Sequence, residues 1–271
     1  MLNQNKKSFI WDGLDDHWRY KMADKQKFPS EIIDLPSEGR VYPKDSPLSS
    51  GKIELKYMTA KEEDILTSDN LIKKGVVITK LLDSLILTKG VKCDDLVLGD
   101  KNGIMVAARI LAYGPKYEAQ IVNPLTNEPM DVVFDLTECP FKKIPDDLGL
   151  NDYEFELPIS KIKVSYKILT GKDEDDIALE LKRINKINKG ASPEITTRMR
   201  YIINAVDGDS SQSTINEFSQ NMLARDCLAL RQEIKRVSPD IDLTQEVEIG
   251  GEMVSVSIPM TTNFFWPNSQ V

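Results

Sequence analysis

The strongest constraint on the fold of this chain is a pattern that occurs once in each half. An alternating strand pattern ends at a threonine, an acidic residue follows three positions later, and an apolar helical pattern begins. The pairs are Thr59 with Glu62 and Thr170 with Asp173. A threonine in this position accepts a hydrogen bond from a free amide of the first helical turn, while the acid reaches back to the cap. Both segments are therefore predicted to be a strand that leads directly into a capped helix.

A second parallel follows each capped helix. In both halves a helical segment comes before two stretches of alternating apolar and polar residues, a pattern that predicts a helix and then a β-hairpin. The helical segments lie around 106–109 and 228–231, and the hairpin strands at 117–122 with 130–136 and at 246–249 with 253–258. A repeat of this length is typical of duplicated structural units, although capped strand–helix units also arise independently. We predict an α+β fold with two related strand–helix–helix–β-hairpin units.

The chain divides into four parts on this basis. They are an N-terminal arm with a turn-rich crossing (1–48), a first α+β repeat (49–145), a second α+β repeat (150–262) and an aromatic C-terminal tail (263–271). The boundary between the repeats falls in 139–151, which is rich in Pro, Asp, Lys and Gly. A chain of 271 residues can bury two modest cores.

Composition excludes several classes of protein. The net charge of −8 argues against a nucleic-acid binder, which needs clustered Lys and Arg. No apolar segment approaches the roughly 20 residues that cross a bilayer, and the N-terminus lacks the apolar core of a signal peptide, so we expect a cytosolic protein with no membrane partner. The three cysteines stand far apart and there is one histidine. We therefore expect no disulfide, no metal site and no cofactor.

Candidate catalytic groups are few. The acids at 173–176 complement the dipole at a helix start, and 207–211 resembles the beginning of a calcium loop without its later ligands, which indicates a polar turn. Asp100 with Arg109, and Asp226 with Arg231, are interpreted as structural ion pairs. An enzyme is not expected. The remaining enzymatic alternative is a hydrolase that uses carboxylates alone, through Asp207 or Asp209.

Aromatic residues near the two ends are the candidate interaction sites. Trp11 and Trp18 belong to an amphipathic N-terminal segment, and Phe264, Phe265 and Trp266 are adjacent near the C-terminus. Each group has two interpretations. The N-terminal aromatics pack on their own domain or bind a partner, and the C-terminal ones close the second domain or anchor into another subunit.

Several landmarks occur in an order that resembles the T-even-type bacteriophage baseplate hub subunit family. They are Leu35-Pro36-Ser37 with Gly39 and Tyr42, Tyr57-Met58-Thr59 with Glu62-Glu63-Asp64, Asp100 with Arg109, Tyr113-Gly114, Leu169-Thr170-Gly171-Lys172-Asp173-Glu174 and Phe264-Phe265-Trp266-Pro267. The resemblance spans roughly 29–267. Many members of that family carry a Cys-x-x-Cys pair in the first hairpin, where this chain has Asn123 to Thr126, so hydrophobic packing is expected to hold the hairpin tip instead.

The resemblance implies a non-enzymatic structural or assembly role in the hub of a contractile tail, with other baseplate hub or tail proteins as partners. The chain would then act in the host cytoplasm during assembly and could remain in the virion as a structural protein. Two alternatives stay open: a transient hub-assembly chaperone absent from the mature virion, and a generic cytosolic adaptor protein. The sequence leaves the oligomeric state open.

Overall fold

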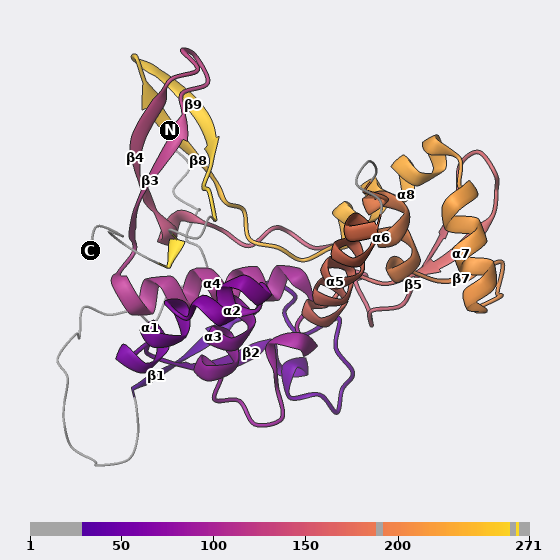
Figure 1. The fold of residues 1–271 in the computed structure, drawn as a ribbon, viewed down its shortest axis with the longest axis horizontal. Helices are drawn as coiled ribbons and strands as arrows, with labels where there is room; N and C mark the ends of the chain where they lie inside the picture. Colours follow the sequence, from indigo (N-terminus) through magenta and orange to yellow (C-terminus); the bar gives the residue numbers. More distant parts are fainter. Residues whose placement is uncertain (1–28, 188–191, 261–263, 266–271) are drawn as a thin grey trace.

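The structure is a computed structural model that describes residues 29–187, 192–260 and 264–265 (Figure 1). The fold is mixed α+β, and every pair of neighbouring strands is antiparallel. The first unit consists of β1 (Ser30–Asp34), β2 (Lys52–Lys56), α1 (Ala60–Leu66), α2 (Asp69–Lys74), α3 (Val77–Leu85), α4 (Leu98–Tyr113), β3 (Lys116–Val122) and β4 (Pro129–Asp135). The second unit consists of β5 (Tyr153–Glu156), β6 (Lys163–Tyr166), α5 (Gly171–Ile187), α6 (Glu194–Ile202), β7 (Ile203–Val206), α7 (Gln212–Asn221), α8 (Ala224–Val237), β8 (Thr244–Ile249) and β9 (Glu252–Ser257). Three 3-10 turns complete the elements: η1 (Pro47–Ser50), η2 (Cys93–Asp95) and η3 (Leu136–Glu138).

Both predicted helix caps are present, and each includes a lysine that the sequence pattern did not indicate. In the first unit Glu62 accepts hydrogen bonds from the Thr59 amide (3.0 Å) and hydroxyl (2.6 Å), while its other oxygen meets the Lys56 ammonium at 2.7 Å. In the second unit Asp173 accepts from the Thr170 amide (2.9 Å) and hydroxyl (3.0 Å) and meets Lys167 at 2.7 Å. The same three groups therefore join the first helix of each unit to the strand that precedes it.

A second arrangement is also repeated. The third residue of the last helix before each hairpin is a buried aspartate that holds the turn after the unit's first strand. Asp100 of α4 accepts from the Ser37 amide at 2.8 Å. Asp226 of α8 accepts from the amides of Ile159 (2.8 Å) and Ser160 (3.0 Å). These matched contacts support duplication of one structural unit.

Helical spacing of apolar residues continues through two positions where the structure has a break. The apolar residues from 71 to 86 have the spacing of one buried helix, but Gly75 ends α2 with a positive φ of 76° and α3 begins at Val77. Leu81, Leu82 and Leu85 of α3 are fully buried, whereas α2 has no buried residue. In the second half the predicted helix from 215 onward breaks at Met222 and Leu223, which separate α7 from α8.

Two smaller features of the second unit also differ from the local sequence pattern. Thr214 and Glu217 have the spacing of a capping box, but the cap is Ser211, whose hydroxyl accepts from the Thr214 amide. Strand β7, which has no clear signal in the sequence, adds to β6 and makes β5–β6–β7 the largest sheet among the described residues.

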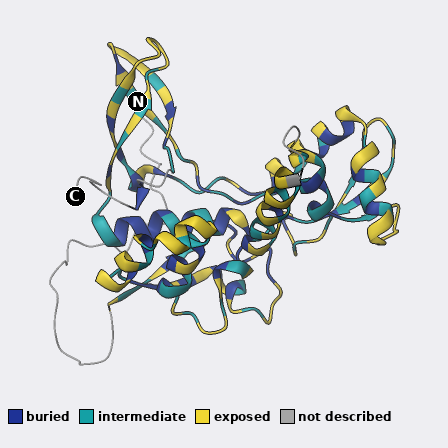
Figure 2. Cartoon of the chain, in the orientation of Figure 1, coloured by how far each residue is buried: buried dark blue, intermediate teal, exposed yellow. Residues whose placement is uncertain are grey.

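The central helix of the first unit is α4, which is buried along most of its length (Figure 2). The hairpin β3–β4 rises away from the helices at the end of α4 that lies farther from α5 (Figure 1). The hairpin β8–β9 of the second unit lies beside it (Figure 1). We call these two hairpins and their roots, residues 116–138 and 242–258, the projection. Gln245 links the hairpins, since its side-chain oxygen accepts from the Asp135 amide at 3.2 Å.

The segment 139–151, predicted as a linker, is packed against the rest of the chain. Cys139, Ile144 and Leu148 are buried. Phe141 and Ile241 form an antiparallel bridge, with hydrogen bonds of 2.8 Å from the Lys142 amide to the Asp240 carbonyl and from the Asp242 amide to the Pro140 carbonyl. The connections into and out of the second unit's helices are therefore paired with each other. None of the described helices is long and apolar enough to cross a membrane.

Candidate interaction surface

The predicted aromatic sites fall into two groups. Trp11, Trp18 and Trp266 lie outside the described residues. Phe264 and Phe265 are described, and each is 1% exposed. The Phe264 ring packs edge-on against Tyr117 with 5.0 Å between centroids, and Phe265 packs edge-on against Phe264 at 5.2 Å.

This packing corrects the predicted place of the C-terminal aromatics. Tyr117 belongs to β3 of the first unit, and its hydroxyl donates to the Pro259 carbonyl at 3.0 Å. The two rings therefore pack on the first hairpin, at the root of the projection. Both rings are buried within the chain in this conformation, so their packing needs no partner protein. Their role as anchors into another subunit stays a prediction.

The predicted ion pair between Asp100 and Arg109 does not form. Arg109 is buried and donates to the carbonyls of Gly114 (3.2 Å) and Lys116 (3.4 Å), and its guanidinium lies over the rings of Tyr113 and Tyr117. Burial lowers the pKa of the Arg109 guanidinium, because a charged group loses solvation. Arg109 therefore fixes the turn from α4 into β3, at the root of the projection.

Asp226 and Arg231 are likewise not paired. Asp226 is buried and bonds to two backbone amides, whereas Arg231 is exposed. Burial alone would raise the pKa of Asp226, but the hydrogen bonds from Ile159 and Ser160 outweigh it, so the pKa is lowered. The charges at 100 and 226 serve the repeated backbone turns.

The acidic turn at 207–211 caps a helix. Asp209 accepts from the Ser211 amide (2.8 Å) and from the hydroxyls of Ser211 (3.1 Å) and Thr214 (2.6 Å). These bonds, made by both carboxylate oxygens, lower the pKa of Asp209. The interpretation as a polar turn is confirmed, and the carboxylate is engaged at the start of α7.

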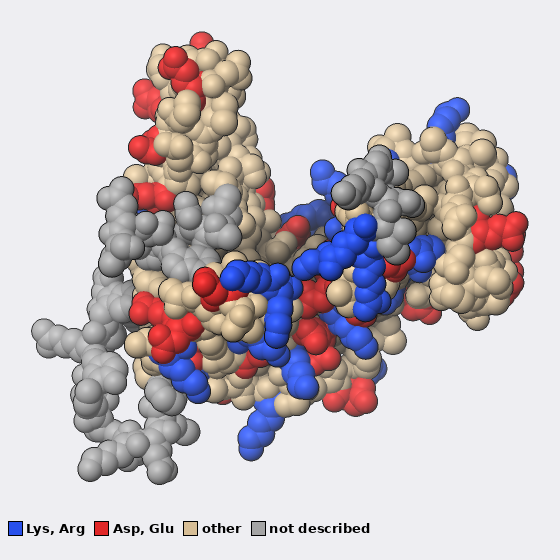
Figure 3. All heavy atoms as spheres, viewed as in Figure 1, with Lys and Arg blue, Asp and Glu red and all other residues tan. Residues whose placement is uncertain are grey.

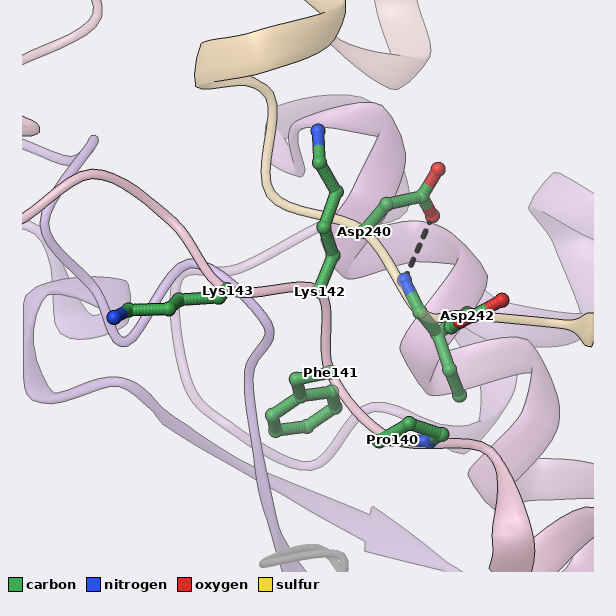
Figure 4. A pocket seen from close by; sticks show the side chains of 7 residues that line it. Pro140, Phe141, Lys142, Lys143, Asp240 and Asp242 are labelled. Atoms are coloured by element: carbon green, nitrogen blue, oxygen red, sulfur yellow. Dashed lines mark hydrogen bonds between the residues drawn. The ribbon is translucent and has the colours of Figure 1, made fainter.

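A small hollow lies at the paired connections (Figure 4). Its lining comes from the two connecting segments, at 140–143 and 240–242. The Lys142 ammonium donates to the Ser238 carbonyl at 3.0 Å and to the Lys235 carbonyl, at the end of α8. Burial lowers the pKa of Lys142. Because its polar groups are used to join the two segments, the hollow is a structural junction.

The projection carries the charge of the whole chain. Its two segments contain nine Asp or Glu and one Lys, a net of −8, while the other residues contain 34 of each sign. The nine acids are Glu118, Glu128, Asp131, Asp135, Glu138, Asp242, Glu246, Glu248 and Glu252. In Figure 3 acidic atoms mark the visible face of the projection, whereas Lys and Arg gather over the middle of the molecule around α5. The hairpins were predicted from the sequence, but the concentration of acidic residues on them was not. Its sequence signal is the acids at the outward positions of the alternating strands.

Large apolar side chains are exposed among these acids. On the outer face of the first hairpin Val133 is 60% and Val122 is 64% exposed. Val133 stands directly opposite Glu118 in the register, and Asp131 shares the same face two residues away. The opposite face of this hairpin carries the buried Tyr117, Val132 and Phe134. The outer face of this hairpin therefore exposes a valine near each end, with Asp131 between them and Glu118 beside Val133.

The tip of the first hairpin is held differently from the prediction. Asn123 accepts from the amides of Leu125 (2.8 Å) and Thr126 (3.3 Å), and its backbone pairs with Glu128 and Asn127 at 2.8 Å. Leu125 is exposed. Hydrogen bonds of an Asx turn, and not hydrophobic packing, hold the tip.

The three cysteines are buried and free, as predicted. Burial raises the pKa of Cys93 and of Cys139 to about 11, which keeps these thiols protonated at neutral pH. Within the described ranges no cluster of three potential metal ligands is present. Comparison with protein-family models, with curated proteins and with solved structures gave no match to this chain.

Proposed function

We propose that this chain is a non-enzymatic structural or assembly protein of the baseplate hub of a contractile phage tail. It acts through protein–protein contacts with other hub or tail proteins in the host cytoplasm. The name of the assembly comes from the order of sequence landmarks between 29 and 267, and the mode of action comes from the shape and surface of the molecule.

The observation that carries the proposal is the projection. Two hairpins from different halves of the chain stand together away from the helices (Figure 1), and the outer face of the first places exposed valines among acids. Large contiguous apolar patches are rare on monomeric soluble proteins, and exposed apolar side chains grouped among polar ones are a feature of interaction sites. A surface of this kind fits docking onto another protein.

The first experiment is mass spectrometry of purified tails, combined with a pull-down of the tagged chain from infected cells. The proposal expects capture of hub proteins from the lysate. Fixed stoichiometry in finished tails would identify a hub component, and absence from tails would identify a transient assembly factor. Failure to co-purify with any tail protein would overturn the proposal in favour of a general adaptor.

A pair of variants tests whether the projection is the contact. Val133→Glu changes an exposed side chain on the projection, and Ile32→Glu changes one on β1 that is 68% exposed. We expect the first to weaken capture of the hub proteins and the second to leave it unchanged, with melting temperatures of both near wild type. Equal capture by both variants would remove the projection from the proposed contact.

A further inference from the structure

The outer face of α5 is the counterpart of the projection in chemistry. Leu179, Lys182, Arg183 and Lys186 follow one another at spacings of three, one and three residues, which places them on a single helical face. All four are exposed, Leu179 by 47%. Among the described residues, no ion pair involves Lys182, Arg183 or Lys186. We call these four residues the α5 stripe; it has an exposed leucine at one end and three basic side chains after it.

The outer face of the first hairpin carries charges of the opposite sign over a similar length. Its outer face from Glu118 to Val122 is about 13 Å long at the rise of a β-strand, and the α5 stripe is about 10 Å long at the rise of a helix. The acids there lack cationic partners: Asp131 accepts a bond from the neutral Gln120 at 3.3 Å, and Glu118 forms no ion pair with a described residue. Each surface therefore supplies the charges that the other lacks.

The two surfaces are held apart within one molecule. Helix α4 runs from the neighbourhood of α5 to the root of the projection (Figure 1), and its 16 residues give a length of about 24 Å. Contact between the surfaces therefore requires two copies of the chain.

We propose that the projection of one copy docks on the α5 stripe of a second copy. Val133 covers Leu179, and Glu118 and Asp131 face Lys182, Arg183 and Lys186. Because the two surfaces are different, the contact is head-to-tail, and each copy keeps one projection and one stripe for further copies. Such contacts close into rings or extend as filaments, depending on the rotation between copies.

The inference does not depend on the tail assignment, because it concerns only the purified chain. Sedimentation velocity measures self-association at concentrations up to about 100 µM, where a contact with a Kd of about 10 µM is mostly occupied. Raising NaCl from about 0.1 M to about 1 M shortens the Debye length from about 10 Å to about 3 Å. We expect association at low salt and a Kd at least about tenfold higher at high salt. A monomer at every concentration in low salt would overturn the proposal and leave other proteins as the partners of the projection.

Two charge-reversal variants identify the surfaces. Glu118→Lys with Asp131→Lys alters the projection alone, and Lys182→Glu with Arg183→Glu alters the stripe alone. We expect each variant to be monomeric by itself. Their equimolar mixture brings the intact stripe of one variant together with the intact projection of the other, so association should return in the mixture.

The control is Lys73→Glu with Lys74→Glu, which reverses two exposed lysines of α2 outside the stripe. It should associate as the wild type does. Circular dichroism melting confirms that every variant is folded. If the mixture of reversed variants stays monomeric, or the α2 control loses association as the stripe variant does, the assignment of these surfaces is wrong.

Discussion

Replacing Asp100 with alanine tests the repeated contact between the last helix and the first turn of a unit. Asp100 is fully buried, and among the described residues it has no cationic partner. One oxygen accepts from the Ser37 amide at 2.8 Å, and the other accepts from the hydroxyls of Ser37 and Tyr42, both at 2.6 Å. The Tyr42 oxygen in turn accepts from the Val97 amide at 3.0 Å, just before α4. One carboxylate thus joins the turn at 35–42 to the start of the central helix.

The free-energy cost of Asp100→Ala comes from the hydrogen-bond donors that are left without an acceptor. The unpaired Ser37 amide costs about 2 kcal/mol, and each of the two hydroxyls costs about 1 kcal/mol, since hydroxyls can rotate towards other acceptors. The substitution also removes the desolvation penalty of a buried charge, which offsets part of this cost. We expect unfolding free energy to fall by about 3 kcal/mol, which corresponds to a melting temperature about 9 °C lower for a chain of this size.

Asp100→Asn separates the charge from the hydrogen bonds. The amide oxygen can still accept from Ser37, so the expected loss is only about 1 kcal/mol. Burial raises the pKa of Asp100, and the bonds from Ser37 and Tyr42 oppose this only in part. For an acid whose folded pKa is raised, the stability contribution is complete below the unfolded pKa of about 3.9 and declines as pH rises through the folded pKa. The asparagine penalty should therefore be largest in acid and shrink towards neutral pH.

Urea denaturation of the three proteins between acid and neutral pH measures both effects. Hydrogen exchange at the Ser37 and Gly39 amides reports whether the loss is local to the turn. Asp45→Ala, an exposed acid in the same crossing, is the control and should stay within about 0.5 kcal/mol of wild type. The reasoning is refuted if Asp100→Ala is equally neutral, or if the asparagine penalty grows towards neutral pH.

Three further predictions use single contacts of the same framework. Hydrogen bonds from Lys56, Ser84 and Thr59 outweigh the effect of burial and lower the pKa of Glu62 to about 2. The stability contribution of Glu62 is therefore present above the unfolded pKa of about 4.3 and is lost as pH falls to about 2. The full shift corresponds to about 3 kcal/mol, so Glu62→Gln should lower the unfolding free energy by up to about 3 kcal/mol in urea melts at neutral pH and by almost nothing near pH 2. Gly99→Ala would place a Cβ 1.8 Å from the Pro239 carbonyl oxygen, whereas a Cβ at Gly149 meets nothing within 4 Å; thermal melts should show a loss of about 2 kcal/mol or more for the first and a neutral second, and equal melts would exclude the close approach. Phe264→Ala should cost about 3 kcal/mol and expose the root of the projection to limited proteolysis, and an unchanged digestion pattern would contradict its packing on Tyr117.

The features predicted correctly from the sequence are those fixed by short stretches of chain. A threonine followed by an acid three residues later defines a helix start almost regardless of the rest of the protein, so both caps were found. The hairpins were found for a similar reason, because alternation over six or seven residues on both sides of a turn specifies their pairing and faces. Each strand end fell within two residues of its predicted position.

The features that were missed depend on contacts between distant segments. Asp100 and Arg109 stand within one helix and have opposite charge, which suggested a pair, yet Ser37 and Gly114 supply better partners once the chain is folded. The break at Met222 carries no glycine or proline, and an unbroken apolar spacing runs through it. The break places Asp226 near the start of a new helix, where its carboxylate accepts hydrogen bonds from the backbone amides of the turn at 159–160. Tertiary contacts override local pattern at such positions.

The pairing of two hairpins explains how the projection can exist. A single two-stranded hairpin is marginal in water, because one face of its strands stays apolar and wet. Each unit ends in one such hairpin, so neither unit alone can bury its inner face. With the two hairpins side by side, Val132 and Phe134 of the first and Ile249 and Val256 of the second all become buried. The paired connections at 140–142 and 240–242 carry the second hairpin back to the first, and the outward faces are then free to hold the acids and valines on which recognition of a partner would depend.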